Sequence, residues 1–217
     1  MVVSHLSFIK NIDDATFKEI ALRSAQLILD QVETLERITN EFAFYAKMPQ
    51  NADNTRFELN ELINSVTNLF ITGNNDKNIK IIISLPDDPL YVYADKNHLL
   101  GAFNNLIKNA IQAIPQQRSG VVRVSLYAQK TKAIVRISDN GVGIPKDVAD
   151  KVFGQNFTTK LQGSGIGLYY TKQIVQSAGG KIYFDSVEDI GTDFFVELDI
   201  FSDNAGTEED TSNPKNF

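Results

Sequence analysis

Four short motifs between residues 105 and 168 carry side chains that suit a site for a nucleotide and a metal ion. In chain order they occupy residues 105–110, 139–145, 157–160 and 163–168. Each motif is common enough to arise by chance when it stands alone. Their order within one stretch of chain is much harder to explain by chance, so we take this stretch as the functional centre.

Asn105 and Asn109 lie four residues apart in a segment expected to be helical, so they share one helix face. Asparagine is a poor helix former, so two of them in a helix interior indicate a specific role. Two amide oxygens at this spacing suit Mg²⁺, which prefers oxygen ligands and keeps several waters. A neutral ligand leaves the charge of the metal available to phosphates. The alternative is that both side chains bridge to loops or face solvent.

Asp139 ends an expected strand and is followed by Gly141 and Gly143. Glycine lets the backbone turn where a side chain would block a ligand. A carboxylate in this position suits the exocyclic amino group of a purine, and such a hydrogen bond contributes about 1.5–3 kcal/mol. It also selects adenine, because guanine presents an acceptor at that position. The alternative is a simple Asp-Asn-Gly turn.

Gly163, Gly165 and Gly167 precede or open a helix expected over residues 166–178. Backbone N–H groups and the positive end of a helix form an anion site at such a start. Lys160, on the preceding loop, is placed to reach a terminal phosphate. The alternatives are a merely flexible loop and a solvated surface lysine.

Composition narrows the class of protein. The 217 residues carry a net charge of −6, are 42% hydrophobic, and include no cysteine and two histidines, His5 and His98. We expect no nucleic acid partner, which would call for a basic stripe, and no disulfide or thiolate metal site. No apolar run approaches a membrane span. The chain is therefore expected to be cytoplasmic, although a longer, membrane-anchored parent protein stays open.

Residues 15–47 are expected to form one long helix, which the segment Met48-Pro49 ends. From Ile28 onward its apolar residues repeat about every 3.5 positions. That stripe favours a helical hairpin or a dimer seam over packing within one small domain. The resulting organisation is a helical region, a second domain and a disordered acidic tail, over residues 1–50, 51–203 and 204–217.

The second domain combines strands and helices without regular alternation. Helices are expected over residues 61–70, 95–114 and 166–178, with a short one from Pro145. Strands are expected over residues 79–85, 90–94, 121–128, 132–139, 181–186 and 192–201. This order favours an α+β fold, a two-layer sandwich in which helices cover one face of a mixed sheet. No Rossmann or Walker glycine spacing occurs.

Together the four motifs resemble the N box, first glycine box, F box and second glycine box of the ATP-binding domain of sensor histidine kinases. The wider class includes Hsp90-type, gyrase-type and mismatch-repair ATPases. Phe153 resembles part of the F box, and residues 191–194 are similar to the closing strand motif. The resemblance covers residues 55–201 and implies the Bergerat-type ATP fold, in which ATP lies between a helix layer and a flexible lid.

The resemblance also implies a role for each matched residue. Asn109 would coordinate Mg²⁺ as the catalytic residue, with Asn105 near the phosphates. Asp139 would accept the adenine amino group, and Thr192 would help to hold adenine through water. The other residues implied to bind ATP are Lys108, Gly141, Gly143, Lys160, Gly163, Gly165, Gly167 and Leu168.

Two features depart from the family pattern. Gln112 stands where many members have a lysine, three residues after the metal-binding asparagine. The helix over residues 15–47 resembles the second helix of the dimerisation and phosphotransfer hairpin, most closely in the nitrogen-regulation sensor branch. The first helix, with its acceptor histidine, has no counterpart here, because neither His5 nor His98 fits that motif.

The resemblance implies a protein-histidine kinase of a two-component phosphorelay. It would transfer the γ-phosphate of Mg-ATP to a histidine not evident in this chain. Its expected partners are a second copy, bound through the N-terminal helix, and the receiver domain of a response regulator. The alternative is a nucleotide-responsive interaction module, a pseudokinase without phosphotransfer. An ATP-hydrolysing clamp is disfavoured, because Asn105 stands where those proteins usually carry a water-activating glutamate.

Overall fold

The computed structural model describes residues 14–46, 52–73, 78–155, 157–158 and 165–202. The chain forms two compact units. One contains helix α2 (Asp14–Ala46), and the other contains every described strand and the remaining helices. No helix in these ranges is both long enough and apolar enough to cross a membrane. The tail expected over residues 204–217 and the helix end expected at Met48-Pro49 lie outside the described residues.

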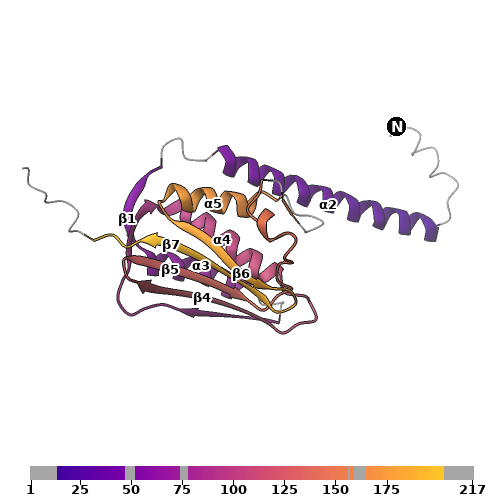
Figure 1. Cartoon of the computed structure of the whole chain (residues 1–217). Helices are drawn as coiled ribbons and strands as arrows, with labels where there is room; N and C mark the ends of the chain where they lie inside the picture. Colours follow the sequence, from indigo (N-terminus) through magenta and orange to yellow (C-terminus); the bar gives the residue numbers. More distant parts are fainter. Residues whose placement is uncertain (1–13, 47–51, 74–77, 156, 159–164, 203–217) are drawn as a thin grey trace, which may run out of the picture. The chain divides into compact units, whose positions relative to one another are not determined.

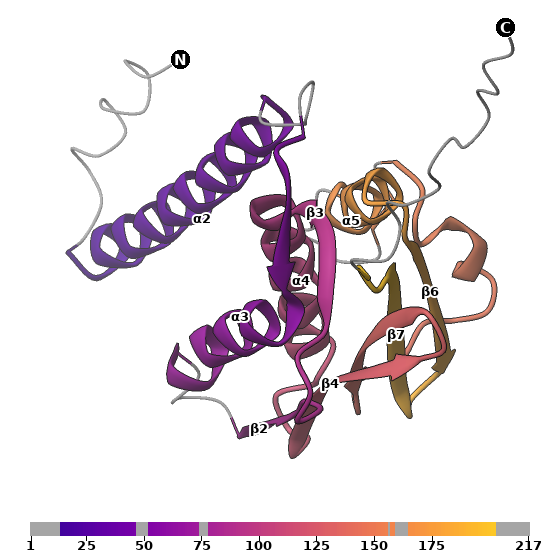
Figure 2. The ribbon, with the colours of Figure 1, turned by 90° about the vertical axis from the view of Figure 1, so that its left-hand side faces the viewer.

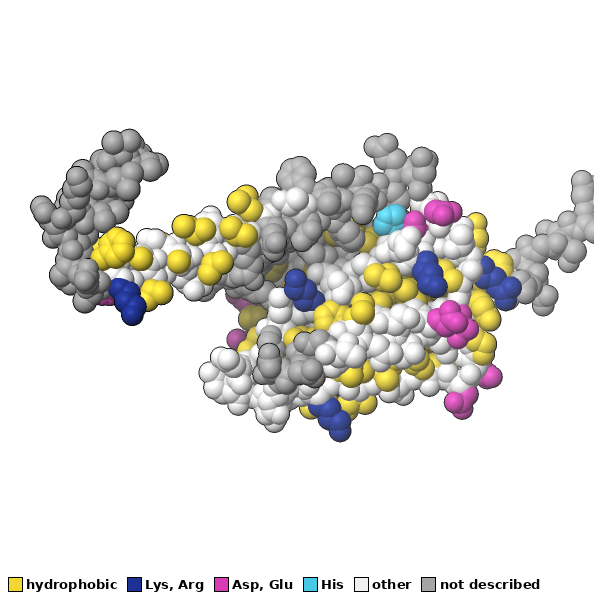
Figure 3. Space-filling view, turned by 180° about the vertical axis from the view of Figure 1, so that it is seen from behind, with side chains coloured by type: hydrophobic (Ala, Val, Ile, Leu, Met, Phe, Trp, Pro, Cys, Tyr) yellow, Lys and Arg dark blue, Asp and Glu magenta, His cyan; other side chains and the backbone are white. Residues whose placement is uncertain are grey.

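Helix α2 has 33 residues, which corresponds to a length of about 50 Å, and its bounds agree with the helix expected from the sequence. Many of its apolar side chains are exposed, and Figure 3 shows them along the helix. They include Phe17, Ile20, Leu27, Ile28, Val32 and Leu35. A helix that exposes this much apolar surface by itself is typical of one that packs against another helix.

The second unit is built on a five-stranded sheet with the strand order β2-β4-β5-β7-β6. These strands are β2 (Ile79–Ser84), β4 (Gly120–Gln129), β5 (Lys132–Asp139), β6 (Lys181–Val187) and β7 (Gly191–Asp199). The pair β2–β4 is parallel and the other pairs are antiparallel, so the sheet is mixed. Figures 1 and 2 show helices α3 (Leu59–Gly73), α4 (Lys96–Gln112) and α5 (Gly167–Ser177) along one face. The α+β sandwich expected from the sequence is therefore confirmed.

Helix α4 uses one face for the core and leaves the other for polar side chains. Its buried residues follow the spacing of three and four that a half-buried helix requires: Leu99, Ala102, Phe103, Leu106, Ile107, Ala110 and Ile111. Asp95 caps the helix by accepting hydrogen bonds from the backbone N–H groups of Asn97 and His98, both at 3.0 Å. Asn105 and Asn109 fall between the buried positions, where they are half-buried.

Two local expectations were wrong. No strand was expected before residue 79, but the structure contains strand β1 (Asn54–Glu58), which pairs with β3 (Tyr91–Asp95) in a separate two-stranded sheet. Only Phe57 in β1 is buried, so the strand has no alternating pattern that would have revealed it. The short helix expected from Pro145 is instead a turn followed by a 3-10 helix (η2, Ala149–Lys151).

Candidate functional site

Asp139 and Thr192, the two residues expected to hold adenine, are brought side by side. They are directly paired at the adjoining ends of β5 and β7. Directly opposed residues of antiparallel strands have Cβ atoms about 5 Å apart. Thr192 is buried, and Asp139 is half-buried. The two ends of these strands therefore form one polar corner of the sheet.

The glycine loop after Asp139 is shaped by close contacts on both sides. The Gly141 N–H donates to Asp139 Oδ1 at 2.8 Å, and a Cβ on Gly141 would lie 2.6 Å from the Ala113 carbonyl oxygen. Gly143 has a φ of 71°, and a Cβ there would collide with the Val187 carbonyl oxygen. Both positions therefore require glycine, the first for space and the second also for its left-handed backbone.

Ser186, which the sequence did not single out, connects this loop to β7. Its hydroxyl accepts a hydrogen bond from the Ile144 N–H at 2.8 Å and donates to the Gly191 carbonyl at 3.0 Å. The Thr192 hydroxyl lies 2.9 Å from Ser186 Oγ. A serine hydroxyl has a single hydrogen, so Thr192 is the donor in this last contact. No local pattern marks Ser186, because its partners come from distant segments.

Asn105 connects the metal-binding face expected on α4 to the start of α5. Its side-chain amide donates to Thr171 Oγ1 at 2.9 Å, and the Thr171 hydroxyl donates to the Gly167 carbonyl at 2.9 Å. A Cβ on Gly167 would lie 2.6 Å from Asn105 Oδ1, so glycine is needed for this close approach. Thr171 is fully buried and is another residue that the sequence alone did not indicate.

Asn109 lies one helical turn beyond Asn105 and is half-buried near the end of α4. An amide oxygen fits Mg²⁺, whose other ligands would be phosphate oxygens and water. The side chains of Lys108 and Gln112 are exposed. Of the two lysines expected near the phosphates, only Lys108 is described, because Lys160 lies outside the described residues.

The N-terminus of α5 has the features of an anion site. The helix begins at Gly167, and its N-cap residue Ile166 makes no side-chain cap hydrogen bond. Gly165, just before it, has a φ of 69°, and Leu168 in the first turn is half-buried. The backbone N–H groups and the positive dipole end of a helix N-terminus favour a phosphate. Gly163 lies outside the described residues.

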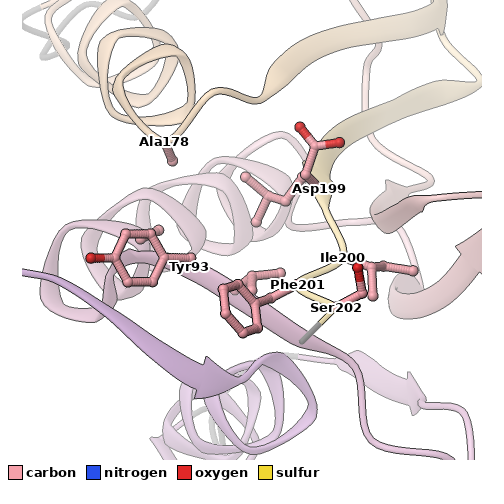
Figure 4. Close-up of a pocket in the computed structure, with 9 residues that line it drawn as sticks. Tyr93, Ala178, Asp199, Ile200, Phe201 and Ser202 are labelled. Carbon is pink, nitrogen blue, oxygen red and sulfur yellow. The ribbon is translucent and has the colours of Figure 1, made fainter. Parts of the chain in front are cut away.

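A cavity of about 190 Å³ lies at the opposite end of β7, and Figure 4 shows Tyr93, Ala178, Asp199 and Phe201 around it. Thr192 and Asp199 lie seven positions apart on an extended strand, which corresponds to roughly 23 Å. None of the lining residues is among those expected to bind ATP. The cavity is therefore a separate feature of the molecule.

Comparison with known proteins supports the same class. Residues 94–201 match the family model described as histidine kinase-, DNA gyrase B- and HSP90-like ATPase. The chain is 33% identical over 172 residues to sporulation kinase A of Bacillus subtilis, covering 79% of this chain and 28% of that protein. It is 27% identical over 203 residues to the sensor protein kinase WalK of Staphylococcus aureus, covering 88% and 33%. The chain thus spans about a third of the length of these curated relatives.

Solved structures agree in fold and in sequence. The catalytic domain of histidine kinase ThkA matches with a TM-score of 0.62 and 33% identity, over 68% of this chain and 96% of that one. ThkA in complex with the response regulator TrrA matches with a TM-score of 0.70 and 28% identity, over 90% and 55%. This chain belongs to the histidine kinase-, DNA gyrase B- and HSP90-like ATPase family, and its second unit is similar to the catalytic domains of histidine kinases.

Proposed function

We propose that this domain binds ATP with Mg²⁺ and supports transfer of the γ-phosphate to a histidine not evident in this chain. One observation carries the assignment of the site. The Ala113 N–H donates to the Asn109 carbonyl at 2.9 Å, and the Ala113 carbonyl accepts from the Val142 N–H at 3.0 Å. The helix with the proposed metal ligand is therefore hydrogen-bonded directly to the loop that follows the proposed adenine acceptor.

Each group has a distinct role in this proposal. Asp139 accepts the adenine amino group, and Thr192 holds the ring through water. Asn109 holds Mg²⁺, which would supply positive charge to the phosphates. Asn105 keeps the start of α5 against α4, so that the N–H groups after Gly165 and Gly167 bind phosphate oxygens. Lys108 or Lys160 supplies an additional positive charge near the phosphates. Gly141, Gly143, Gly163 and Leu168 complete the nucleotide site.

In this proposal a helix presents the acceptor histidine to the γ-phosphate. The protein aligns this histidine rather than activating it chemically, because phosphoryl transfer depends mainly on alignment and charge stabilisation. We propose that residues 1–50 belong to the dimerisation and phosphotransfer region of a homodimer, because α2 exposes an apolar stripe. Residues 51–203 form the kinase domain, followed by a tail over residues 204–217. The nitrogen-regulation branch stays a prediction.

A response regulator receives the phosphate in this proposal, and the ThkA–TrrA complex, which matches this chain at 28% identity, supports that partner. We place the reaction in the cytoplasm, because ATP is available there. The kinase names of the relatives favour transfer over a nucleotide-responsive interaction module.

Calorimetric titration of the full chain with a non-hydrolysable ATP analogue, with and without Mg²⁺, tests this function. We expect binding that depends on Mg²⁺. The Asp139→Asn variant should bind the analogue with an affinity lower by about 100-fold, because the charged acceptor is lost. Asp87→Asn, in an exposed turn, is the matched control and should bind normally. Unchanged affinity in the Asp139 variant would contradict the role in base recognition.

A second measurement tests transfer. An acceptor helix that carries the histidine is added in trans with ATP, and acid-labile phosphate is measured. Acid-labile phosphate on the helix supports the kinase. Tight binding of Mg-ATP without any transfer would instead favour the interaction module.

A further inference from the structure

Arg118 holds the loop that contains the proposed adenine acceptor. It lies in the connection between α4 and β4 and is half-buried. Its Nη1 donates to the Asn140 carbonyl at 2.7 Å and to the Gly141 carbonyl at 2.6 Å. These are the two carbonyl groups that follow Asp139. Hydrogen bonds from a guanidinium are charge-assisted and about twice as strong as neutral ones.

One of these hydrogen bonds is made to the peptide group whose N–H donates to the Asp139 carboxylate. The Asn140 carbonyl and the Gly141 N–H belong to one planar peptide. Arg118 binds its oxygen, and its N–H donates to Asp139 Oδ1 at 2.8 Å. Fixing the oxygen of a planar group fixes the direction of its N–H, and a cation at the carbonyl makes the N–H a stronger donor.

The loop has other anchors that do not depend on Arg118. The Asn140 side chain accepts from the Val121 N–H at 2.7 Å and donates to the Ser119 carbonyl at 2.9 Å. The Val142 N–H is held by the Ala113 carbonyl at 3.0 Å. Removing the guanidinium therefore leaves the path of the loop in place and acts mainly on the peptide between Asn140 and Gly141.

We infer that Arg118 is a positioning residue for base recognition: through this peptide it sets the orientation of the Asp139 carboxylate and so the selectivity for a base that carries an exocyclic amino group. The inference rests on the function proposed above. Arg118 itself does not touch the base. Its effect should appear only with a nucleotide whose base donates to Asp139.

The test compares two nucleotides on the full chain. The first is a non-hydrolysable ATP analogue, and the second is the same compound with purine, which lacks the amino group, in place of adenine. Arg118→Met removes both hydrogen bonds and keeps the length of the side chain. We expect its dissociation constant for the adenine compound to rise about tenfold, while that for the purine compound changes less than about twofold, because this compound makes no bond to Asp139.

Two further variants separate positioning from a general effect. Arg118→Lys keeps the charge and a donor, and it should recover part of the preference for adenine. Arg123→Met removes an exposed arginine of β4 and should leave both dissociation constants unchanged. The free energy of unfolding is measured by urea for every variant, so that a loss of stability is not taken for a loss of selectivity.

Equal weakening of both compounds in the Arg118→Met variant, or no weakening of either, would overturn the inference. If that variant does not fold, Arg118→Lys decides, and an unchanged preference for adenine in it rejects the positioning role. Failure of the wild-type chain to bind the adenine compound would reject the proposed function and this inference together. If the wild-type chain binds the adenine compound and the Arg118 variants keep its preference for adenine, only this inference is rejected.

Discussion

The two ends of strand β7 are built in different ways. At its first residues, polar groups hold one another: Ser186 contacts Thr192 and the Gly191 carbonyl, and Asp139 lies opposite. Just beyond its last residue, the chain contacts β3 through a pair of aromatic rings and a backbone hydrogen bond. Phe201 lies 6.0 Å from the Tyr93 ring, centroid to centroid, and its N–H donates to the Tyr91 carbonyl at 2.7 Å.

Under the proposed function, the two ends of one strand would serve nucleotide binding and stability separately. Hydrogen bonds between side chains and backbone fix the shape of a loop, and so the position of the groups that a ligand would meet. At the other end, the buried side chain of Leu198 stabilises the fold by burying apolar surface. We therefore expect substitutions at the two ends to separate: those at the Thr192 end change nucleotide affinity, and those at the Asp199 end change the free energy of unfolding.

The largest effect should come from the core at the far end. Leu198 is 1% exposed and lines the cavity. Leu198→Ala should lower the free energy of unfolding by about 3 kcal/mol, because it leaves a void, and should change the affinity for an ATP analogue less than about twofold. Urea unfolding followed by circular dichroism measures the first, and calorimetry of the folded variant measures the second. A large loss of affinity here would break the separation.

At the site, Asn109→Asp should weaken binding of the Mg²⁺ complex of the ATP analogue by about 30-fold, or roughly 2 kcal/mol, because a carboxylate adds negative charge beside the phosphates. Unfolding should change by less than about 0.5 kcal/mol, as for most half-exposed positions. Asn104→Asp, exposed on the same helix, is the control. Equal losses in both variants would indicate a general charge effect on α4.

A smaller effect is expected for Thr192→Val, which keeps the shape of the side chain and removes the hydroxyl. Affinity for the ATP analogue should fall about fivefold, or roughly 1 kcal/mol, and Thr192→Ser should restore it. Calorimetric titration of both variants provides the comparison. If Thr192→Ser binds as weakly as Thr192→Val, the methyl group rather than the hydroxyl matters, and the polar description of this end needs revision.

The smallest effect is expected for the ion pair at the far end. Lys132 Nζ lies 2.7 Å from Asp199 Oδ1, and the two side chains are 39% and 65% exposed. Lys132→Met should change the free energy of unfolding by less than about 0.5 kcal/mol, because exposed ion pairs are well solvated. Unfolding curves at low and high salt test this. A loss above about 1 kcal/mol would show that charge, and not only packing, supports this end.

Much of the fold follows from local signals in the sequence. Helix α4 has an Asp95 cap and a regular apolar face, and strand β5 was expected with the bounds that it has. Strand β1 could not be predicted in the same way. Four of its five residues are not buried, and its pairing depends on β3, which lies far along the chain.

The residues of the site also fall into those that the sequence predicted and those that it did not. Motifs indicated Asp139, Asn105 and Asn109, because each combines an unusual residue with a recognisable neighbourhood. Ser186 and Thr171 were missed, since a serine or threonine on a strand or helix has no distinctive spacing. Their importance arises from partners that only folding brings together.

The parallel pairing of β2 with β4 also bears on the order in which the chain folds. β4 and β5 are neighbours in sequence, with Gln129 paired to Lys132 and Lys130 in the turn at a φ of 57°. β3 and α4 lie between β2 and β4 in the sequence, and contacts between segments so far apart form slowly. We therefore expect the hairpin that contains Asp139 to form before the pairing of β2 with β4, to which the crossover with Asn109 leads. Nucleotide added during refolding should therefore report the completion of the last step rather than the collapse of the sheet.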